Sequence, residues 1–513
     1  MSLIDLKSEQ SLEPICVDIC IIGGGAAGIF LANKIHKQGK RVAIIEAGPK
    51  KPVSAEIAGF KVNFNDQEYL GAKNGRFFGL GGSTSRWGGN IMPHLDLDKG
   101  DDFFSESWSK LVSKISAESS EVLRDLGYKH NPNFSKYMGV AYPKVLQEIE
   151  ESNVCQYSSL MMPFMKKNFS TFLPSKLKSR NDFIVLFNAV AKEWSFSSQD
   201  TKILKEIVAI SINGNRAIIK APKFVIAAGA IESARILLEI DEANTRDIFP
   251  KGTPVGHFLG DHLSVTIADV RSEDMKKAID MFCMRFDGNW MRASRFYIKN
   301  SVPNLPRAFA HFEFENKSAG FSFVRDLMQA LQTKQFSLIS INSFIKALRE
   351  IMIIGYNRIF RSRLFIPNVT AVKMQLDVEQ DPYYENKISL TDKLDSFGRK
   401  EISINWKITD KDLDRIRSVS NHFLSNWPNE SKVLPKLIAR DLDFQKHKPH
   451  DAYHPVGLCR IGFSGESVVN YDLKVHGIEN LWILSTGIFP TTGSANPTFS
   501  LLCLANRLAK KLR

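Results

Sequence analysis

Residues 15–30 read ICVDICIIGGGAAGIF. The first eight form a short and nearly continuous apolar run, as expected of a strand buried on both faces in a parallel sheet. The run ends in three glycines, after which the pattern predicts a helix through residues 28–38. RVAIIEAG at residues 41–48 then supplies a second strand. Together these segments predict a βαβ unit.

The glycines of this unit have the spacing of a dinucleotide-binding turn. Gly23, Gly25 and Gly28 fit the GxGxxG pattern between strand and helix, where glycine permits a tight turn and close approach of a pyrophosphate. Glu46 ends the second strand, 18 residues beyond Gly28, where a carboxylate can accept hydrogen bonds from ribose hydroxyls and would repel the 2′-phosphate of NADP. The alternative is a glycine-rich turn in an unrelated α/β protein. These residues alone do not separate FAD from NAD.

The composition of the whole chain narrows the function classes. With 513 residues the chain exceeds the size of a single hydrophobic core, so two or more domains are expected. Its net charge of +13 could attract nucleic acid, an anionic membrane or a phosphorylated substrate. The basic residues are scattered, however, and no nucleic-acid-binding motif accompanies them. We therefore expect no nucleic-acid partner.

Cysteine usage and targeting signals predict the compartment. The six cysteines form no CxxC pair, which suits a reducing compartment. The first 14 residues lack the basic region and the apolar run of a signal peptide. No segment offers the roughly 18 uninterrupted apolar residues of a transmembrane helix. We expect a cytoplasmic protein.

Further stretches carry a resemblance to a known family. They are GLGGSTSRWGGN at 79–90, FVIAAGAIESARILL at 224–238, PVGHFLGDHLS at 254–264, YHPVGLCRIG at 453–462 and VVNYDLKVHGIENLWILSTGIFPTTGSANPTFSLL at 468–502. The two C-terminal stretches are the most specific. With them the chain resembles the glucose-methanol-choline (GMC) family of FAD-dependent oxidoreductases, most closely over the cofactor-binding half.

The resemblance implies an α/β fold with two parts. One is a doubly wound, Rossmann-like, three-layer FAD-binding domain, expected in residues 1–95, 184–270 and 446–513. The other is a discontinuous α+β substrate-binding or cap domain built on an antiparallel sheet, expected in residues 96–183 and 271–445.

The resemblance also implies which residues hold FAD. The glycine turn and Glu46 would bind the ADP half, and the backbone of Val190 would meet the adenine. The full set of expected FAD-binding residues is Gly23, Gly25, Ala26, Ala27, Gly28, Glu46, Ala47, Gly82, Ser83, Arg86, Trp87, Gly89, Asn90, Val190, Ala228, Gly229, Thr486, Asn496, Pro497 and Thr498.

Two departures from the family pattern concern the flavin. Some members join FAD covalently to a histidine in the loop that corresponds to residues 83–87. This chain has no histidine there, so we expect non-covalent FAD. Ser485 replaces an aspartate that is common in the family, which leaves one flavin contact open.

Alcohol oxidation requires a base that removes the hydroxyl proton while hydride leaves the carbon, and imidazole suits that task near neutral pH. Among the 11 histidines, His454 in HPVG matches the family's catalytic position, and Asn496 in SANPTF matches its partner. The resemblance thus implies oxidation of a CH–OH group to a carbonyl by hydride transfer to flavin N5. His454 would take the proton and Asn496 would orient the alcohol. The alternative for His454 is a hydrogen-bonded structural histidine.

The substrate, the electron acceptor and two other functions stay open. A sugar or polyol, or a lipid-linked alcohol, is the preferred small-molecule substrate, and the acceptor is O2 or an unknown compound. A flavin-binding lyase or other non-redox enzyme on the same fold is the first alternative function. A flavin-free binding protein is the second.

Two remaining features concern metals and membranes. The spacing of His257 and His262 fits no standard zinc pattern, so no metal is expected. Residues 321–365 form a basic amphipathic region that predicts either peripheral contact with an anionic membrane or a pair of cap helices with solvated charges. Its cations are Arg325, Lys334, Lys346, Arg349, Arg358, Arg361 and Arg363.

Overall fold

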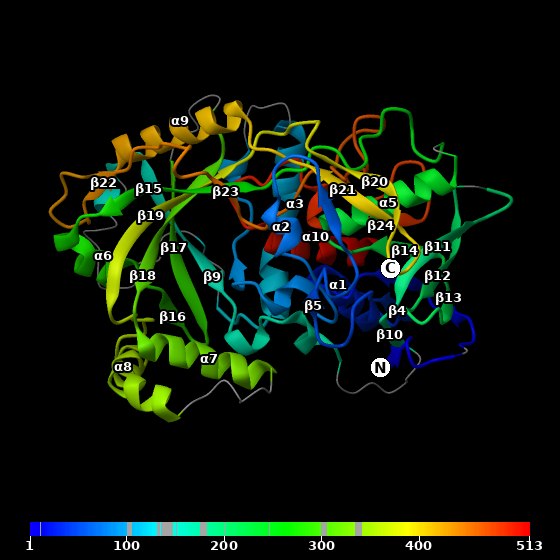
Figure 1. The fold of residues 1–513 in the computed structure, drawn as a ribbon, viewed down its shortest axis with the longest axis horizontal. Helices are drawn as coiled ribbons and strands as arrows, with labels where there is room; N and C mark the ends of the chain where they lie inside the picture. Colours follow the sequence, from blue (N-terminus) through cyan, green and yellow to red (C-terminus); the bar gives the residue numbers. More distant parts are fainter. Residues whose placement is uncertain are drawn as a thin grey trace.

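The computed structural model describes residues 1–10, 12–99, 105–130, 134, 147–149, 151–174, 182–200, 202–245, 247–298, 305–333 and 341–513. Two large sheets lie side by side in the molecule (Figure 1). Both termini lie on the side of the parallel sheet, at the right of the view.

The first large sheet is parallel and is assembled from segments far apart in the sequence. Its strands, in spatial order, are β1 (Ser2–Asp5), β10 (Phe183–Phe187), β4 (Val42–Ile45), β3 (Ile19–Ile22), β14 (Lys223–Ile226) and β24 (Leu481–Ile483). The central strands ICII and VAII are buried along their whole length, as in a sheet covered on both faces. The strand order reverses at β3, which is where α/β sheets bind ligands. The predicted doubly wound α/β fold is confirmed.

The apolar run at residues 15–22 is not one strand as predicted. It divides into β2 (Ile15–Cys16), which pairs with a different sheet, and β3. The break falls at Asp18, whose carboxylate accepts a hydrogen bond from the backbone N–H of Arg41. This polar contact fixes the turn between the two short strands, and the apolar pattern alone does not reveal it.

The second large sheet is antiparallel, as predicted. Its main strands, in spatial order, are β22 (Leu437–Ala439), β15 (His262–Val270), β19 (Val369–Glu379), β18 (Ala308–Asn316), β17 (Trp290–Ile298), β9 (Val154–Met161) and β8 (Asn90–Ile91). Two further strands, β16 (Arg285–Asp287) and β23 (His450–Asp451), pair with β17 and β15. β15 belongs to this sheet although its sequence falls in the segment expected to form the FAD-binding domain. The proposed division into domains stays a prediction.

Smaller sheets extend the two large ones. One contains β11 (Val190–Phe196), β12 (Leu204–Ile210), β13 (Arg216–Lys220) and β2; another contains β20 (Lys387–Leu394), β21 (Lys400–Asn405) and β6 (Val62–Phe64); and a third pairs β5 (Val53–Ser54) with β7 (Phe77–Phe78).

The helices that concern the site lie at both ends of the chain. α1 (Ala26–Lys37) follows the glycine turn and packs beside the last helix, α10 (Pro497–Lys511). The remaining α-helices of the described residues are α2 (Leu70–Lys73), α3 (Ser105–Asp125), α5 (Ala230–Ala243), α6 (Met275–Phe282), α7 (Ala319–Thr333), α8 (Ile341–Phe360) and α9 (Asp410–Asn426). In Figure 1, α9 lies over the top of the antiparallel sheet, and α7 and α8 lie below it at the lower left.

A single hydrophobic core joins the two large sheets. Ile21 of β3 and Phe296 of β17 are fully buried members of the same cluster. The two sheets are therefore parts of one packed body.

Candidate active site

The glycine turn has the geometry that its spacing predicts. Gly23 has a φ of +111°, and a Cβ there would lie 2.4 Å from the carbonyl oxygen of Ala227 on the neighbouring strand connection. A Cβ on Gly28 would lie 2.0 Å from the carbonyl oxygen of Gly23. Only glycine fits these two positions, so the turn stays tight and the N-terminus of α1 stays close to it.

Glu46 holds three loops together at this turn. One of its carboxylate oxygens accepts the N–H of Gly24 at 2.7 Å, and the other accepts those of Gly48 and Gly79, each at 2.8 Å. Burial raises the pKa of the Glu46 carboxyl, and the three N–H donors oppose that rise. The sequence predicts that this carboxylate binds ribose. Its hydrogen bonds to three backbone N–H groups show that it also holds the surrounding loops in place.

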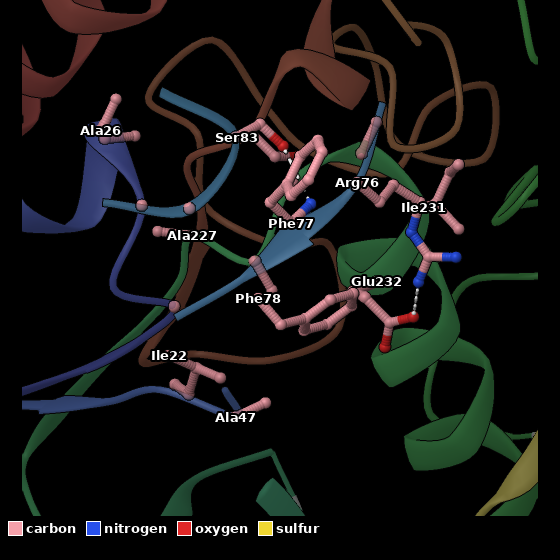
Figure 2. A pocket seen from close by; sticks show the side chains of 18 of the residues that line it. Ile22, Ala26, Ala47, Arg76, Phe77, Phe78, Ser83, Ala227, Ile231 and Glu232 are labelled. Atoms are coloured by element: carbon pink, nitrogen blue, oxygen red, sulfur yellow. Dashed lines mark hydrogen bonds and ion pairs between the residues drawn. The ribbon is translucent and has the colours of Figure 1, made fainter. Parts of the chain in front are cut away.

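A cavity runs from this turn to the C-terminal loops, and most residues of the predicted FAD site line it. The predicted residues that line it are Gly23, Gly25, Ala26, Ala27, Glu46, Ala47, Gly82, Ser83, Val190, Ala228, Gly229, Thr486 and Thr498. They come from the carboxyl ends of the parallel strands, the loop around η1 (Gly82–Ser85) and the start of α10. Figure 2 shows Ile22, Ala26, Ala47, Ser83 and Ala227 around this space.

The other predicted residues lie outside this lining. Gly28 and Pro497 belong to the helix starts that border the cavity, and Gly89 packs against the Lys167 side chain. Arg86 and Trp87 line a different surface cavity, together with Lys50 and Lys51. Asn90 and Asn496 face the antiparallel sheet, and their contacts are described below.

The structure adds cavity residues that sequence reasoning missed. Arg76 and Glu232 form a buried ion pair at 2.5 Å, drawn as a dashed line in Figure 2, with Phe77 and Phe78 beside it. Tyr453, which precedes His454, also lines the cavity and has a φ of +63°. A positive φ on a tyrosine is uncommon and often marks a functional site. Other additions include Phe60, Arg399, Pro455 and Ser485.

The cavity suits FAD on grounds independent of its motifs. The Ser485 hydroxyl oxygen is buried, lines the cavity and has no hydrogen-bond partner among the described residues. A Cβ built on Gly25, the residue before α1, would meet no protein atom within 4 Å. An unsatisfied hydroxyl and free space at a helix N-terminus both fit a bound phosphorylated cofactor. Ser485 can thus supply the polar contact to the flavin that the family's aspartate would make.

His454 and Asn496 lie together beside the cavity. The Nδ2 atom of Asn496 is 3.2 Å from Nε2 of His454. Asn496 is the residue immediately before α10, where Pro497 at the first helical position fixes the chain direction. His454 is held by its backbone N–H, which donates to both carboxylate oxygens of Asp261 at 3.0 and 2.8 Å. Residues 42 positions apart in the sequence thus form one pair.

The hydrogen bonds assign the tautomer of His454. Arg295 can only donate, and it donates to Oδ1 of Asn496, so Nδ2 of Asn496 must face His454 as a donor. His454 Nε2 is therefore an unprotonated acceptor, and its proton resides on Nδ1, 3.3 Å from Nδ1 of His262. His262 in turn donates from Nε2 to the carbonyl of Gly493 at 2.9 Å. The chain of contacts makes His454 Nε2 a hydrogen-bond acceptor, and Asn496 Nδ2 donates to it.

Burial keeps His454 in this neutral form. Desolvation, assisted by the nearby His262 and Arg295, lowers the pKa of His454 to about 3, although Asp377 opposes the shift. The pKa of His262 is also lowered, chiefly by burial. Both rings are consequently neutral at physiological pH, so Nε2 of His454 carries no proton.

Asp261, His262 and His454 also have the proximity of a metal site, since their ligand atoms lie within 4.8 Å of one another. Their atoms are already engaged, however. The Asp261 carboxylate accepts hydrogen bonds from the Tyr69 hydroxyl and from the backbone of both histidines, and His262 Nε2 contacts Gly493. His257 is elsewhere, stacked on Tyr384. We interpret the cluster as the support of His454, and the expectation of no metal stays a prediction.

Two family models match separate segments of the chain, and one relative aligns with nearly its full length. Residues 382–505 match the family described as GMC oxidoreductase, and residues 18–74, which include the glycine turn, match the family described as lycopene cyclase protein. Glucose dehydrogenase (FAD, quinone) of Drosophila melanogaster is 24% identical over 99% of this chain and 88% of its own length. Oxygen-dependent choline dehydrogenase of Chromohalobacter salexigens is 32% identical over 14% of this chain and 13% of its own.

Solved structures share the fold along nearly the whole chain. Pyridoxine 4-oxidase from Mesorbium loti has a TM-score of 0.59 at 15% identity, covering 96% of this chain and 98% of that one. A formate oxidase variant from Aspergillus oryzae RIB40 has a TM-score of 0.57 at 13% identity, covering 98% and 99%. The C-terminal family match, the full-length relative and the shared architecture make this chain similar to the FAD-dependent oxidoreductases of the GMC family.

Proposed function

We propose that this oxidoreductase converts an alcohol to a carbonyl compound, with His454 as the base. The observation that supports this function is the unprotonated Nε2 of a buried, neutral His454, which Asn496 faces at 3.2 Å. Asn496 donates to this lone pair when no substrate is bound. An alcohol that takes the place of Asn496 at Nε2 would donate its hydroxyl proton there and leave Nδ2 of Asn496 free to donate to the alcohol oxygen. Proton removal at Nε2 offsets the positive charge that would otherwise develop on the alcohol oxygen as hydride leaves the carbon.

FAD, when bound, supplies the hydride acceptor. The chain's own residues would bind and orient it through the glycine turn, the N-terminus of α1 and the loops around Ser83 and Ser485. Asn496 would donate to the alcohol oxygen, and Asp261 and His262 would hold His454 in place. These two are positioning residues, since they act through His454. Because the loop 83–87 has no histidine, non-covalent attachment stays our prediction.

The names of similar proteins give starting points for the substrate: one is a glucose dehydrogenase, one a choline dehydrogenase and one a pyridoxine oxidase. A sugar or polyol and a lipid-linked alcohol both stay within the proposal, as do O2 and other electron acceptors. A lyase on the same fold would also retain FAD, but it would turn over substrate without reducing the flavin.

Anaerobic titration of the purified protein tests the proposed reaction. We expect the flavin absorbance to bleach when the right class of alcohol is added, because hydride transfer reduces FAD. The panel should contain sugars, polyols, aryl alcohols, long-chain alcohols and hydroxy acids. Turnover of a substrate with an unbleached flavin would favour the lyase, and a colourless protein that binds no added FAD would contradict the cofactor assignment.

We propose in addition that α8 rests on an anionic membrane. Six apolar side chains recur every three or four residues along α8 and are all exposed, from 42% for Leu348 to 78% for Ile341. The six are Ile341, Ile345, Leu348, Met352, Tyr356 and Ile359. An apolar stripe that faces outward is the opposite of a packed cap helix. No helix among the described residues is long and apolar enough to cross a bilayer, so contact would be peripheral.

Fewer exposed cations surround this stripe than the sequence predicted. Lys346, Arg349 and Arg361 are exposed and can attract anionic headgroups, at about 1 kcal/mol each. Arg363, which was expected among them, is buried and pairs with Asp280 at 2.7 Å. Arg358 lies over the Phe286 ring and donates to a backbone carbonyl. Lys334 lies outside the described residues.

Vesicle flotation tests the membrane contact. We expect the protein to float with vesicles that contain phosphatidylserine, and the double variant Ile345→Glu, Ile359→Glu to bind at least about tenfold less, because burial of each isoleucine contributes about 1.5–3 kcal/mol. A matched control makes the same change at two exposed isoleucines elsewhere, Ile57→Glu and Ile212→Glu. Equal flotation of both double variants, or none of the parent protein, would contradict the proposal.

A further inference from the structure

Arg295 is a buried cation beside the catalytic pair. It lies on β17, is 4% exposed, and its guanidinium carbon stands 4.0 Å from the centre of the Phe309 ring. One terminal nitrogen, Nη2, donates to Oδ1 of Asn496. The other, Nη1, is buried and makes no hydrogen bond within the described residues, whereas the Tyr297 hydroxyl interacts with the guanidinium; no ion pair to a carboxylate is found for Arg295 in the described part of the chain. Since a buried charge without a counterion is strongly unfavourable, this guanidinium is arranged for an anion from outside the chain.

A cavity separate from the FAD site lies between strands of the antiparallel sheet, and Arg295 is part of its lining. β17 pairs with β9 along its length, from Met291 to Ile298, but it pairs with β18 at Phe296 and Ala310. Beyond that point β17 and β18 diverge, and the cavity lies in the opening, since residues of both strands line it. We call this opening the passage; Arg295, which contacts Asn496, is part of its lining.

The lining of this passage is apolar except near Arg295. Asn90, Ser159 and His311 supply polar atoms, and Oδ1 of Asn90 is buried without a partner among the described residues. The apolar lining includes Met161, Phe282, Phe312, Phe314, Leu364 and Ile366. It also includes Phe321 of α7, so the passage borders the helical hairpin that carries the exposed stripe of α8. Such a lining suits a hydrocarbon chain whose polar end is at Arg295.

We propose that the alcohol substrate is a hydroxy acid with an alkyl chain. Arg295 binds its carboxylate, and the chain occupies the passage between β17 and β18. Because Arg295 contacts Asn496 and Asn496 contacts His454, a hydroxyl on a carbon close to the carboxylate, as in a 2- or 3-hydroxy acid, would lie nearest to His454. This inference rests on the proposed alcohol oxidation. The hydroxyl proton would go to His454, the C–H hydrogen would leave with its electron pair as hydride, for which FAD when bound supplies the acceptor, and the product would be an oxo acid.

A binding measurement tests the anion site without any turnover. Octanoate and octanamide have the same chain and differ in charge, and neither has a hydroxyl group. Calorimetry on the FAD-loaded protein should show octanoate binding about 10- to 100-fold more tightly, because a charge-assisted pair with arginine is lost in the amide. Affinity should rise about fourfold per methylene from butanoate to octanoate as apolar surface enters the passage. In Arg295→Gln the preference for the acid should disappear, whereas Arg295→Lys should retain part of it.

Anaerobic flavin reduction tests the same preference in the reaction. 2-Hydroxyoctanoate should reduce the flavin with a kcat/KM about 10- to 100-fold above that of 2-hydroxyoctanamide, and Arg295→Gln should bring the two together. The ratio is the readout, since the loss of the contact with Asn496 will slow both substrates. The flavin spectrum and melting temperature of each variant establish that it is folded and loaded.

The outcomes separate this inference from the proposed function. If a neutral alcohol bleaches the flavin while acid and amide bind and react equally, alcohol oxidation stands and the anion site is wrong. If octanoate binds through Arg295 but no alcohol bleaches the flavin, the anion site stands and the proposed reaction is wrong. A preference for the acid that persists in Arg295→Gln would also overturn the assignment to Arg295.

Discussion

Replacing His454 with alanine is expected to slow anaerobic flavin reduction by about 10²- to 10⁴-fold, because the alcohol then loses its positioned base. FAD should remain bound, since the FAD cavity is lined by Tyr453 and Pro455 on either side of His454 and not by His454 itself. Stopped-flow absorbance with a saturating alcohol measures the rate. Gln is a useful second substitution, because it fills the same buried space.

The pH dependence of the same reaction gives a second readout. Because the pKa of His454 is lowered to about 3, the ring stays neutral as the pH falls from 8 to 5, and its protonation should not reduce the rate over that range. An ordinary histidine base would lose activity below its pKa of about 6.5. His447→Ala is the matched control, as His447 is exposed. Equal rates in the His454 and His447 variants would remove His454 from the mechanism.

Gly28→Ala is expected to yield a protein that lacks FAD. The added Cβ would overlap the carbonyl oxygen of Gly23 at 2.0 Å, so α1 must move away from the turn that is expected to hold the pyrophosphate. Overpacking of this kind costs about 1–3 kcal/mol of folding free energy. The flavin content of the purified variant and its melting temperature with and without added FAD measure both effects.

Two other glycines make this test specific. A Cβ on Gly355 in α8 meets nothing within 4 Å, so Gly355→Ala should keep FAD and the melting temperature. A Cβ on Gly25 is equally free of protein contacts, but Gly25 lines the FAD cavity. Gly25→Ala should therefore fold normally, and weaker FAD binding in this variant would show that the free space belongs to the cofactor. Full FAD content in Gly28→Ala would contradict the assigned role of the turn.

The sequence predicted those parts of the site that depend on short-range geometry. The turn around Gly23 and Gly28 follows from spacing, because both residues act within one strand–turn–helix unit. The C-terminal motifs identified His454 and Asn496 as a pair, and the structure places them 3.2 Å apart. The parallel and antiparallel sheets were also predictable, since buried apolar runs and the family resemblance both indicated them.

The sequence by itself thus predicted the class of cofactor, the family resemblance and the candidate base, because these depend on local spacing and motif chemistry. The tertiary structure decided what surrounds the base. The hydrogen bonds that assign the tautomer of His454 come from His262 and Arg295, which lie on β15 and β17, and no local pattern links those strands to the C-terminal loop. The sequence also did not reveal that Arg363 is buried. It pairs with Asp280 and therefore does not belong to the predicted basic surface. Partners and burial depend on where the chain path brings distant segments together, and that path is set by packing of the whole core.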